Sequence, residues 1–113
     1  MINGLYSIHV NLLDGRSGRG SGVIVFRDGK LLGGDAYLFY TGTYTVRDNA
    51  MRGEVIITQH TPSPDETPLF GGQQVSIGFS GKIAGNAGTM SGTALVGKAS
   101  VIFEATLRKM ADA

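Results

Sequence analysis

Cysteine is the first absence that matters in this 113-residue chain, because no disulfide can support the fold and no thiol can act as a nucleophile or metal ligand. The first residues lack the cationic segment followed by an apolar run that marks a secretory signal. No apolar stretch reaches the roughly 20 residues that a membrane-spanning helix needs. We therefore expect a cytoplasmic protein with no membrane span.

The chain also lacks an excess of charge of either sign. Ten basic and nine acidic residues leave a formal net charge of +1, and they are scattered along the chain. The tightest basic groups are two pairs, Arg16 with Arg19 and Arg108 with Lys109, which are too sparse to follow a phosphate backbone. We therefore expect no nucleic-acid partner.

Side chains suited to catalysis or metal binding are few, and they do not cluster in the sequence. His9 has the polar phase of the first expected strand, and His60 stands just before the prolines, whereas a zinc site needs three or four converging ligands. No serine lies in a nucleophile elbow or beside a matched base. We therefore predict that the protein is not an enzyme and has no catalytic residue, no metal and no cofactor.

Alternation of apolar and polar residues dominates what is present, and it predicts strands almost throughout. Asp28-Gly29 and Asp48-Asn49 are typical of tight turns between paired strands. No amphipathic helix of useful length is evident. The expected strands cover residues 6–12, 20–26, 30–32, 36–47, 51–60, 75–83, 89–96 and 99–107.

Eight strands with short connections predict an all-β fold, namely an eight-stranded antiparallel up-and-down β-barrel of the calycin or lipocalin kind. A strongly twisted sheet of this size closes on itself and so removes its exposed edges. Residues 1–113 are expected to form this single domain. A β-sandwich is the alternative, and the lack of long crossovers favours the barrel. All three prolines lie in residues 61–72, where we expect a loop that covers one end.

Glycine is abundant, at eighteen residues, although it is costly inside strands. Five glycines share the phase of large apolar neighbours and are predicted to face the interior: Gly22, Gly42, Gly53, Gly81 and Gly92. Their small size suits an inner wall that is sharply curved, or one that encloses a partly hollow space. Elsewhere, Gly33-Gly34-Asp35 is predicted to be a structural turn in which the carboxylate bonds nearby backbone N–H groups.

The inward phase also carries aromatic side chains. They either fill a narrow barrel completely or line an apolar pocket in which tyrosine hydroxyls orient a small apolar ligand. Both interpretations stay open at this point. The candidate ligand-binding residues of the interior are Tyr6, Phe26, Tyr40, Tyr44, Phe79 and Phe103.

The outward phase is expected to be polar, yet several of its members are large and apolar. An apolar patch on an outer wall marks an association surface, so we predict a homodimer that pairs the same patch across a two-fold axis. The alternative is an ordinary surface on which the two rings lie flat over neighbouring side chains. The candidate interface residues are Val23, Val25, Tyr37, Phe39 and Ile56.

Four segments carry a family resemblance: residues 4–8 (Gly-Leu-Tyr-Ser-Ile), 20–25, 29–35 and 40–44. With its Gly-Gly-Asp turn and its Tyr-x-Gly element, the chain resembles the GrlR-type family over nearly its whole length. The best-known members are bacterial negative regulators of type III secretion genes. The resemblance implies a calycin-like eight-stranded barrel, a dimer, and action by protein–protein contact in which a transcriptional activator is sequestered. The acidic loop of those regulators has no counterpart in residues 46–50, which hold one acid and one arginine.

Two functions are therefore expected. The first is a non-catalytic regulatory or binding protein that acts through its surface on a protein partner such as a transcriptional regulator. The second is a carrier that holds a small apolar ligand, such as a lipid or an aromatic metabolite, inside the barrel.

Overall fold

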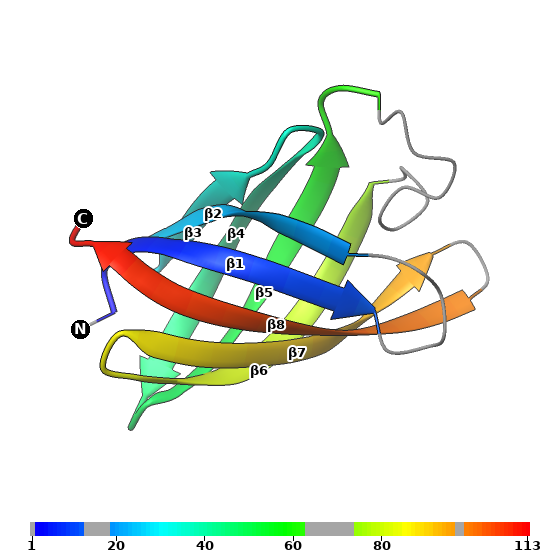
Figure 1. Cartoon of the computed structure of the whole chain (residues 1–113). Helices are drawn as coiled ribbons and strands as arrows, with labels where there is room; N and C mark the ends of the chain where they lie inside the picture. Colours follow the sequence, from blue (N-terminus) through cyan, green and yellow to red (C-terminus); the bar gives the residue numbers. More distant parts are fainter. Residues whose placement is uncertain (1, 13–18, 63–73, 97–98) are drawn as a thin grey trace.

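The computed structural model describes residues 2–12, 19–62, 74–96 and 99–113. Each strand in this part of the chain pairs antiparallel with the next, and the last pairs with the first, which closes the barrel (Figure 1). The predicted eight-stranded up-and-down barrel is therefore confirmed. The strands are β1 (Gly4–Leu12), β2 (Arg19–Arg27), β3 (Lys30–Gly34), β4 (Leu38–Arg47), β5 (Ala50–Gln59), β6 (Val75–Ala84), β7 (Ala87–Val96) and β8 (Ala99–Ala111).

Tight turns join the strands at one end of the barrel. Asp28 and Gly29 join β2 to β3 with φ of 51° and 85°, and Asp48 and Asn49 join β4 to β5 with φ of 51° and 68°. Positive φ at both central positions gives the mirror-image turn that matches strand twist, so both predicted hairpins are confirmed. The β6–β7 turn is as short, and β7 consequently begins at Ala87 rather than at residue 89.

The other end carries the β1–β2, β3–β4, β5–β6 and β7–β8 connections (Figure 1). The loop expected over residues 61–72 falls largely in positions 63–73, which lie outside the described residues. Strand β8 continues to Ala111, past its expected end at residue 107, because Lys109 pairs with Tyr6 and Ala111 with Leu5. Among the described residues, no helix is long and apolar enough to cross a membrane.

Apolar side chains fill the interior, and no polar side chain of the described residues is buried with them. The largest fully buried side chains are those of Tyr6, Ile24, Phe26, Leu31, Met51 and Ile77. Val46 shares the strand phase of the buried Tyr44, but it is 41% exposed. The pairing of β3 with β4 ends at Thr43, so Val46 lies beyond the last β3 neighbour.

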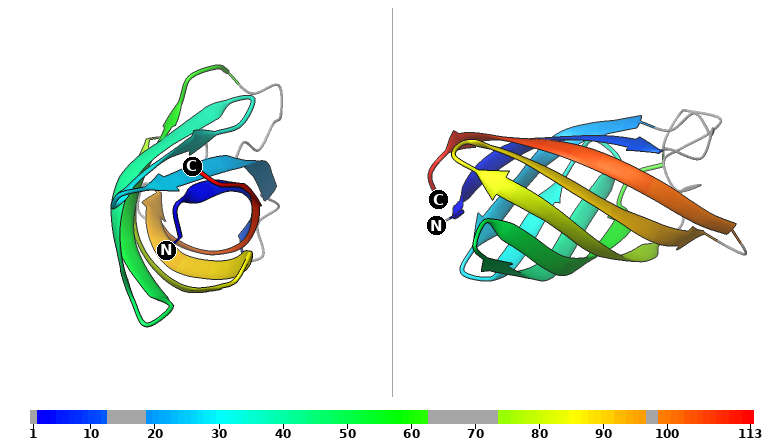
Figure 2. Two further views of the ribbon diagram at one scale, coloured as in Figure 1. Left: turned by 90° about the vertical axis from the view of Figure 1, so that its left-hand side faces the viewer. Right: turned by 90° about the horizontal axis from the view of Figure 1, so that it is seen from below.

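The inward glycines bring neighbouring strands close together rather than leaving gaps. A Cβ atom at Gly42 would overlap the carbonyl oxygen of Glu54 and stand 3.0 Å from Cα of Val55. At Gly81 it would overlap the carbonyl oxygen of Thr89. Neighbouring strands therefore approach closely at these glycines, as a sharply curved inner wall requires, and the explanation by a hollow interior does not apply to them. The molecule is elongated and flattened, with extents of 38 × 24 × 19 Å. The left-hand view of Figure 2, along the barrel, shows its flattened outline.

Candidate functional site

The six aromatic residues proposed to line the interior all lie inside the barrel, each less than a tenth exposed. They do not converge on one pocket. Tyr6, Phe26 and Tyr44 pack edge to face toward the tight-turn end, with ring centroids 5.4 and 5.1 Å apart. Tyr40 and Phe103 lie elsewhere, along an apolar void. Phe79 packs against the backbone at Gly53, where a Cβ atom would stand 2.7 Å from its Cζ.

The void beside Tyr40 and Phe103 has a volume of only about 30 Å³. A cavity that admits benzene has a volume of about 150 Å³. A lipid or aromatic metabolite would therefore have to displace side chains that now fill the barrel. The packed interior, and not a preformed pocket, is what the described residues build.

The hydroxyl groups of two interior tyrosines hydrogen-bond to the residues just before β1, at the tight-turn end of the barrel. Tyr6 donates to the Ile2 carbonyl oxygen at 2.8 Å, and Tyr44 donates to Oδ1 of Asn3 at 3.4 Å. Asn3 is held in turn by Asp28, whose backbone N–H donates to Asn3 Oδ1 and whose carboxylate accepts from Asn3 Nδ2. Sequence reasoning missed Asn3, because nothing in its local pattern indicates that the β2–β3 turn lies beside it.

Asp35 organises the connection between β3 and β4 at the other end. Its Oδ1 accepts from the backbone N–H groups of Tyr37 and Leu38, both at 2.8 Å, and its Oδ2 accepts from the Tyr40 hydroxyl at 3.2 Å. Gly22 lets this turn lie close, since a Cβ atom there would stand 3.1 Å from Cβ of Asp35. The structure thus brings the predicted turn residue together with one predicted interior residue, Tyr40.

His60 links the same turn to the end of β5. Its Nε2 lies 3.1 Å from the Asp35 carbonyl oxygen, and its backbone N–H donates to the Tyr37 carbonyl oxygen at 2.8 Å. Its ring nitrogens therefore contact neutral oxygens and not the Asp35 carboxylate. Within the described ranges, no three histidine or acidic residues gather closely enough to hold a metal ion. The cluster is suited to holding the turn in place.

Tyr40 gives the barrel a specific alkaline sensitivity. Burial is the main cause that raises the pKa of Tyr40 above its ordinary value of 10.0, and the charge of Asp35 and the hydrogen bond to it act in the same direction. In the unfolded chain Tyr40 ionises near pH 10, whereas in the barrel it keeps its proton. The stability linked to this group is therefore complete below pH 10 and is lost as the pH rises above it.

We expect urea unfolding of the wild type and of Tyr40→Phe to show the loss of stability that is linked to the ionisation of Tyr40. Between about pH 10 and pH 11, the free energy of unfolding of the wild type should fall by about 1 kcal/mol more than that of the variant, and above about pH 11 the difference in slope should approach about 1.4 kcal/mol per pH unit. The other tyrosines are common to both proteins and cancel. Parallel pH curves would contradict the assignment.

An apolar face covers the outer wall formed by β2, β3, β4 and β5. The strand register places Val25 opposite Leu32, Leu32 opposite Thr41, and Thr41 opposite Ile56, so these four side chains form a continuous row. Val23 and Phe39 occupy the adjacent row. We call Val23, Val25, Leu32, Phe39 and Ile56 the apolar face. The most exposed of them is Leu32, at 59%, and Phe39 and Ile56 are each 40% exposed.

Four of the five predicted interface residues lie on this face. Phe39 and Ile56 are diagonal neighbours on adjacent strands. The fifth, Tyr37, is half-buried in the β3–β4 connection and packs against the core. Leu32 was missed, although the Asp28-Gly29 hairpin signal fixes its pairing with Val25 and could have found it.

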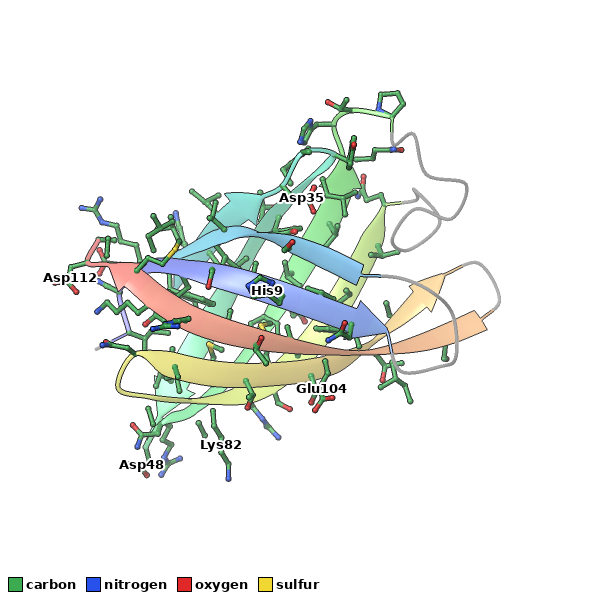
Figure 3. The ribbon with its side chains drawn as sticks, in the orientation of Figure 1. His9, Asp35, Asp48, Lys82, Glu104 and Asp112 are labelled. Carbon is green, nitrogen blue, oxygen red and sulfur yellow. The ribbon has the colours of Figure 1, made fainter. Side chains whose placement is uncertain are left out.

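The opposite wall, over β5 to β8, has a different character. A shallow hollow of about 620 Å³ lies on it around Gly78, where a Cβ atom would meet nothing within 4 Å. Its rim is polar and includes Arg52, Ser80 and Ser91. Figure 3 shows Lys82 and Glu104 on this side of the barrel, away from Asp35. Of the described residues that line the hollow, Ile102 is apolar and 50% exposed and the other exposed side chains are polar, so we call this side the polar wall.

Comparison with known proteins adds no family to this description. A scan against models of protein families finds no match, and a search of curated proteins finds no relative.

Proposed function

We propose that this chain is a non-catalytic regulatory or binding protein that acts in the cytoplasm by protein–protein contact through its apolar face. One observation carries the proposal: Leu32, Phe39 and Ile56 lie on the neighbouring strands β3, β4 and β5 of one wall and are each 40% exposed or more. A contiguous apolar patch on a soluble domain is costly unless a partner covers it. Among the described residues, the interior holds a void of only about 30 Å³.

The resemblance to GrlR-type negative regulators supports the same mode of action. In that reading the partner is a transcriptional regulator that the barrel holds by contact, without chemistry. The segment that matches the acidic loop, residues 46–50, lacks its run of acids. Recognition is therefore assigned to the apolar face and not to that hairpin.

Site-specific crosslinking in cells tests the proposal. A photoreactive benzoylphenylalanine in place of Leu32 is expected to give discrete protein adducts, because this side chain is at the centre of the face. The same group in place of Ser91, which is exposed on the polar wall, is expected to give none. Mass spectrometry of the adducts then tells a second copy of the chain from another protein.

The introduction of Phe39→Asp into the Leu32 crosslinking variant provides the control for specificity. A carboxylate in the apolar face should suppress the adducts while circular dichroism of the purified protein stays that of a barrel. Equal crosslinking from Leu32 and Ser91, or adducts that survive Phe39→Asp, would refute contact through this face.

A further inference from the structure

We propose that Asn3 is a site of spontaneous deamidation, a reaction that the closed barrel slows and that weakens the tight-turn end of the barrel once it has occurred. Asn3 precedes Gly4, whereas the other three asparagines of the chain precede leucine or alanine. Glycine has no side chain, so its backbone nitrogen is the least hindered in attacking the carboxamide of a preceding asparagine. This site is independent of the apolar face and of the proposed function.

Deamidation needs only water as a co-reactant. The Gly4 backbone nitrogen loses its proton to the solvent and attacks Cγ of Asn3, and the Asn3 Nδ2 group takes up a proton and leaves as ammonia. The product is a five-membered succinimide ring. Water then adds to one of the two ring carbonyl carbons and breaks the bond from that carbon to the ring nitrogen. The result is aspartate or isoaspartate at position 3, and each has a carboxylate where the native chain has a neutral amide.

The folded chain holds the Asn3 carboxamide against the β2–β3 turn. Its Oδ1 accepts from the Asp28 backbone N–H at 3.1 Å and from the Tyr44 hydroxyl at 3.4 Å. Its Nδ2 donates to Oδ1 of Asp28 at 3.0 Å. Ring closure draws Cγ onto the Gly4 nitrogen, so the carboxamide has to leave these partners before it reacts.

The backbone on either side of Asn3 is also fixed. The Ile2 carbonyl oxygen accepts from the Tyr6 hydroxyl at 2.8 Å, and Gly4 is paired with Phe26 of β2. Asn3 is therefore expected to react from the fraction of molecules in which the start of β1 has opened. Its rate of deamidation follows the population of that open form.

The product carboxylate conflicts with Asp28. The Nδ2 donor is lost, and two negative charges meet where the native chain has a hydrogen bond of 3.0 Å. The Asp28 side chain is 71% exposed, so solvent screens the repulsion and the loss of stability is moderate. Isoaspartate also lengthens the backbone by one carbon atom directly before β1, which disturbs the pairing of Gly4 with Phe26.

Peptide mapping with mass spectrometry measures the reaction at mildly alkaline pH, in the folded protein and in guanidinium chloride. Asn3 is expected to convert at least about tenfold faster in denaturant than in the folded barrel, because every unfolded molecule is open. Asn49 and Asn86, which precede alanine, should convert more slowly than Asn3 in denaturant. No conversion of Asn3 in denaturant, or equal Asn3 rates in the two states, would overturn the proposal.

Asp28→Gly tests the restraint on the carboxamide. It removes the carboxylate acceptor without straining the turn, because glycine readily adopts the φ of 51° found at Asp28. The folded variant should deamidate at Asn3 about threefold faster than the wild type or more, with equal rates in denaturant. Asp48→Gly makes the same change at the same φ in the β4–β5 turn and should leave the Asn3 rate unchanged. An unchanged rate in Asp28→Gly, or the same increase in both variants, would refute the restraint by Asp28.

Asn3→Asp reproduces one product and tests the consequence for stability. Its Tm at neutral pH should lie about 5 °C or more below that of the wild type. In the Asp28→Gly background the same substitution should cost much less, since no second carboxylate faces it. Asn86→Asp, in the exposed β6–β7 turn, should change Tm by no more than about 2 °C. An unchanged Tm in Asn3→Asp would contradict the weakening of this end of the barrel.

Discussion

Gly42→Ala is expected to lower the free energy of unfolding by about 3 kcal/mol or more, the upper end of what overpacking costs. The added methyl group would overlap the Glu54 carbonyl oxygen and crowd Cα of Val55. Both obstacles belong to the backbone of a paired strand, so neither can rotate away. In a domain of this size the loss corresponds to a fall in Tm of about 10–20 °C, which differential scanning calorimetry measures.

Gly78→Ala is the matched control for this prediction. Gly78 also lies in a central strand, but its Cβ position is open to solvent. Alanine there should be neutral or stabilising by about 0.5 kcal/mol, because glycine in a strand is entropically costly. A similar loss of stability in both variants would show that crowding between strands does not explain the inward glycines.

The second large effect is expected at Asp35. Asp35→Ala removes the acceptor of two backbone N–H groups and of the Tyr40 hydroxyl, which are partly buried. Hydrogen bonds to a charged acceptor contribute about 1.5–3 kcal/mol, and unpaired donors add to the cost. We therefore expect Asp35→Ala to destabilise the barrel by about 2–4 kcal/mol in urea unfolding at neutral pH.

Two comparisons make the Asp35 prediction specific. Asp35→Asn keeps one oxygen acceptor and should recover part of the loss. Glu104→Ala removes an exposed carboxylate from β8 and should change stability by no more than about 0.5 kcal/mol. Equal effects of the two alanine variants would mean that the Asp35 turn is dispensable.

Strand phase was the most informative part of the sequence, because a side chain's neighbours two residues away report which face it shares. Tyr6 and Phe79 were placed inside on this basis, and both are buried. Phase also placed Phe39 outside, where it is 40% exposed. Phase alone does not report the burial of Val46, since alternation gives the direction of a side chain but not where a neighbouring strand ends.

The close approach of neighbouring strands could not be predicted from the sequence. An inward glycine has the same pattern whether it leaves a gap or admits a neighbouring carbonyl, and only coordinates separate the two at Gly42. The contacts of Asn3 with Asp28 and Tyr44 are likewise set by how the barrel closes. Register, in contrast, was accessible: the Asp28-Gly29 turn fixes Val25 opposite Leu32 and so completes the apolar face.

Photocrosslinking in cells from benzoylphenylalanine at position 32, with and without Phe39→Asp, tests the central claim most directly. The account predicts discrete protein adducts that Phe39→Asp suppresses while the barrel stays folded. No adduct from position 32, or adducts that Phe39→Asp leaves unchanged, would contradict it.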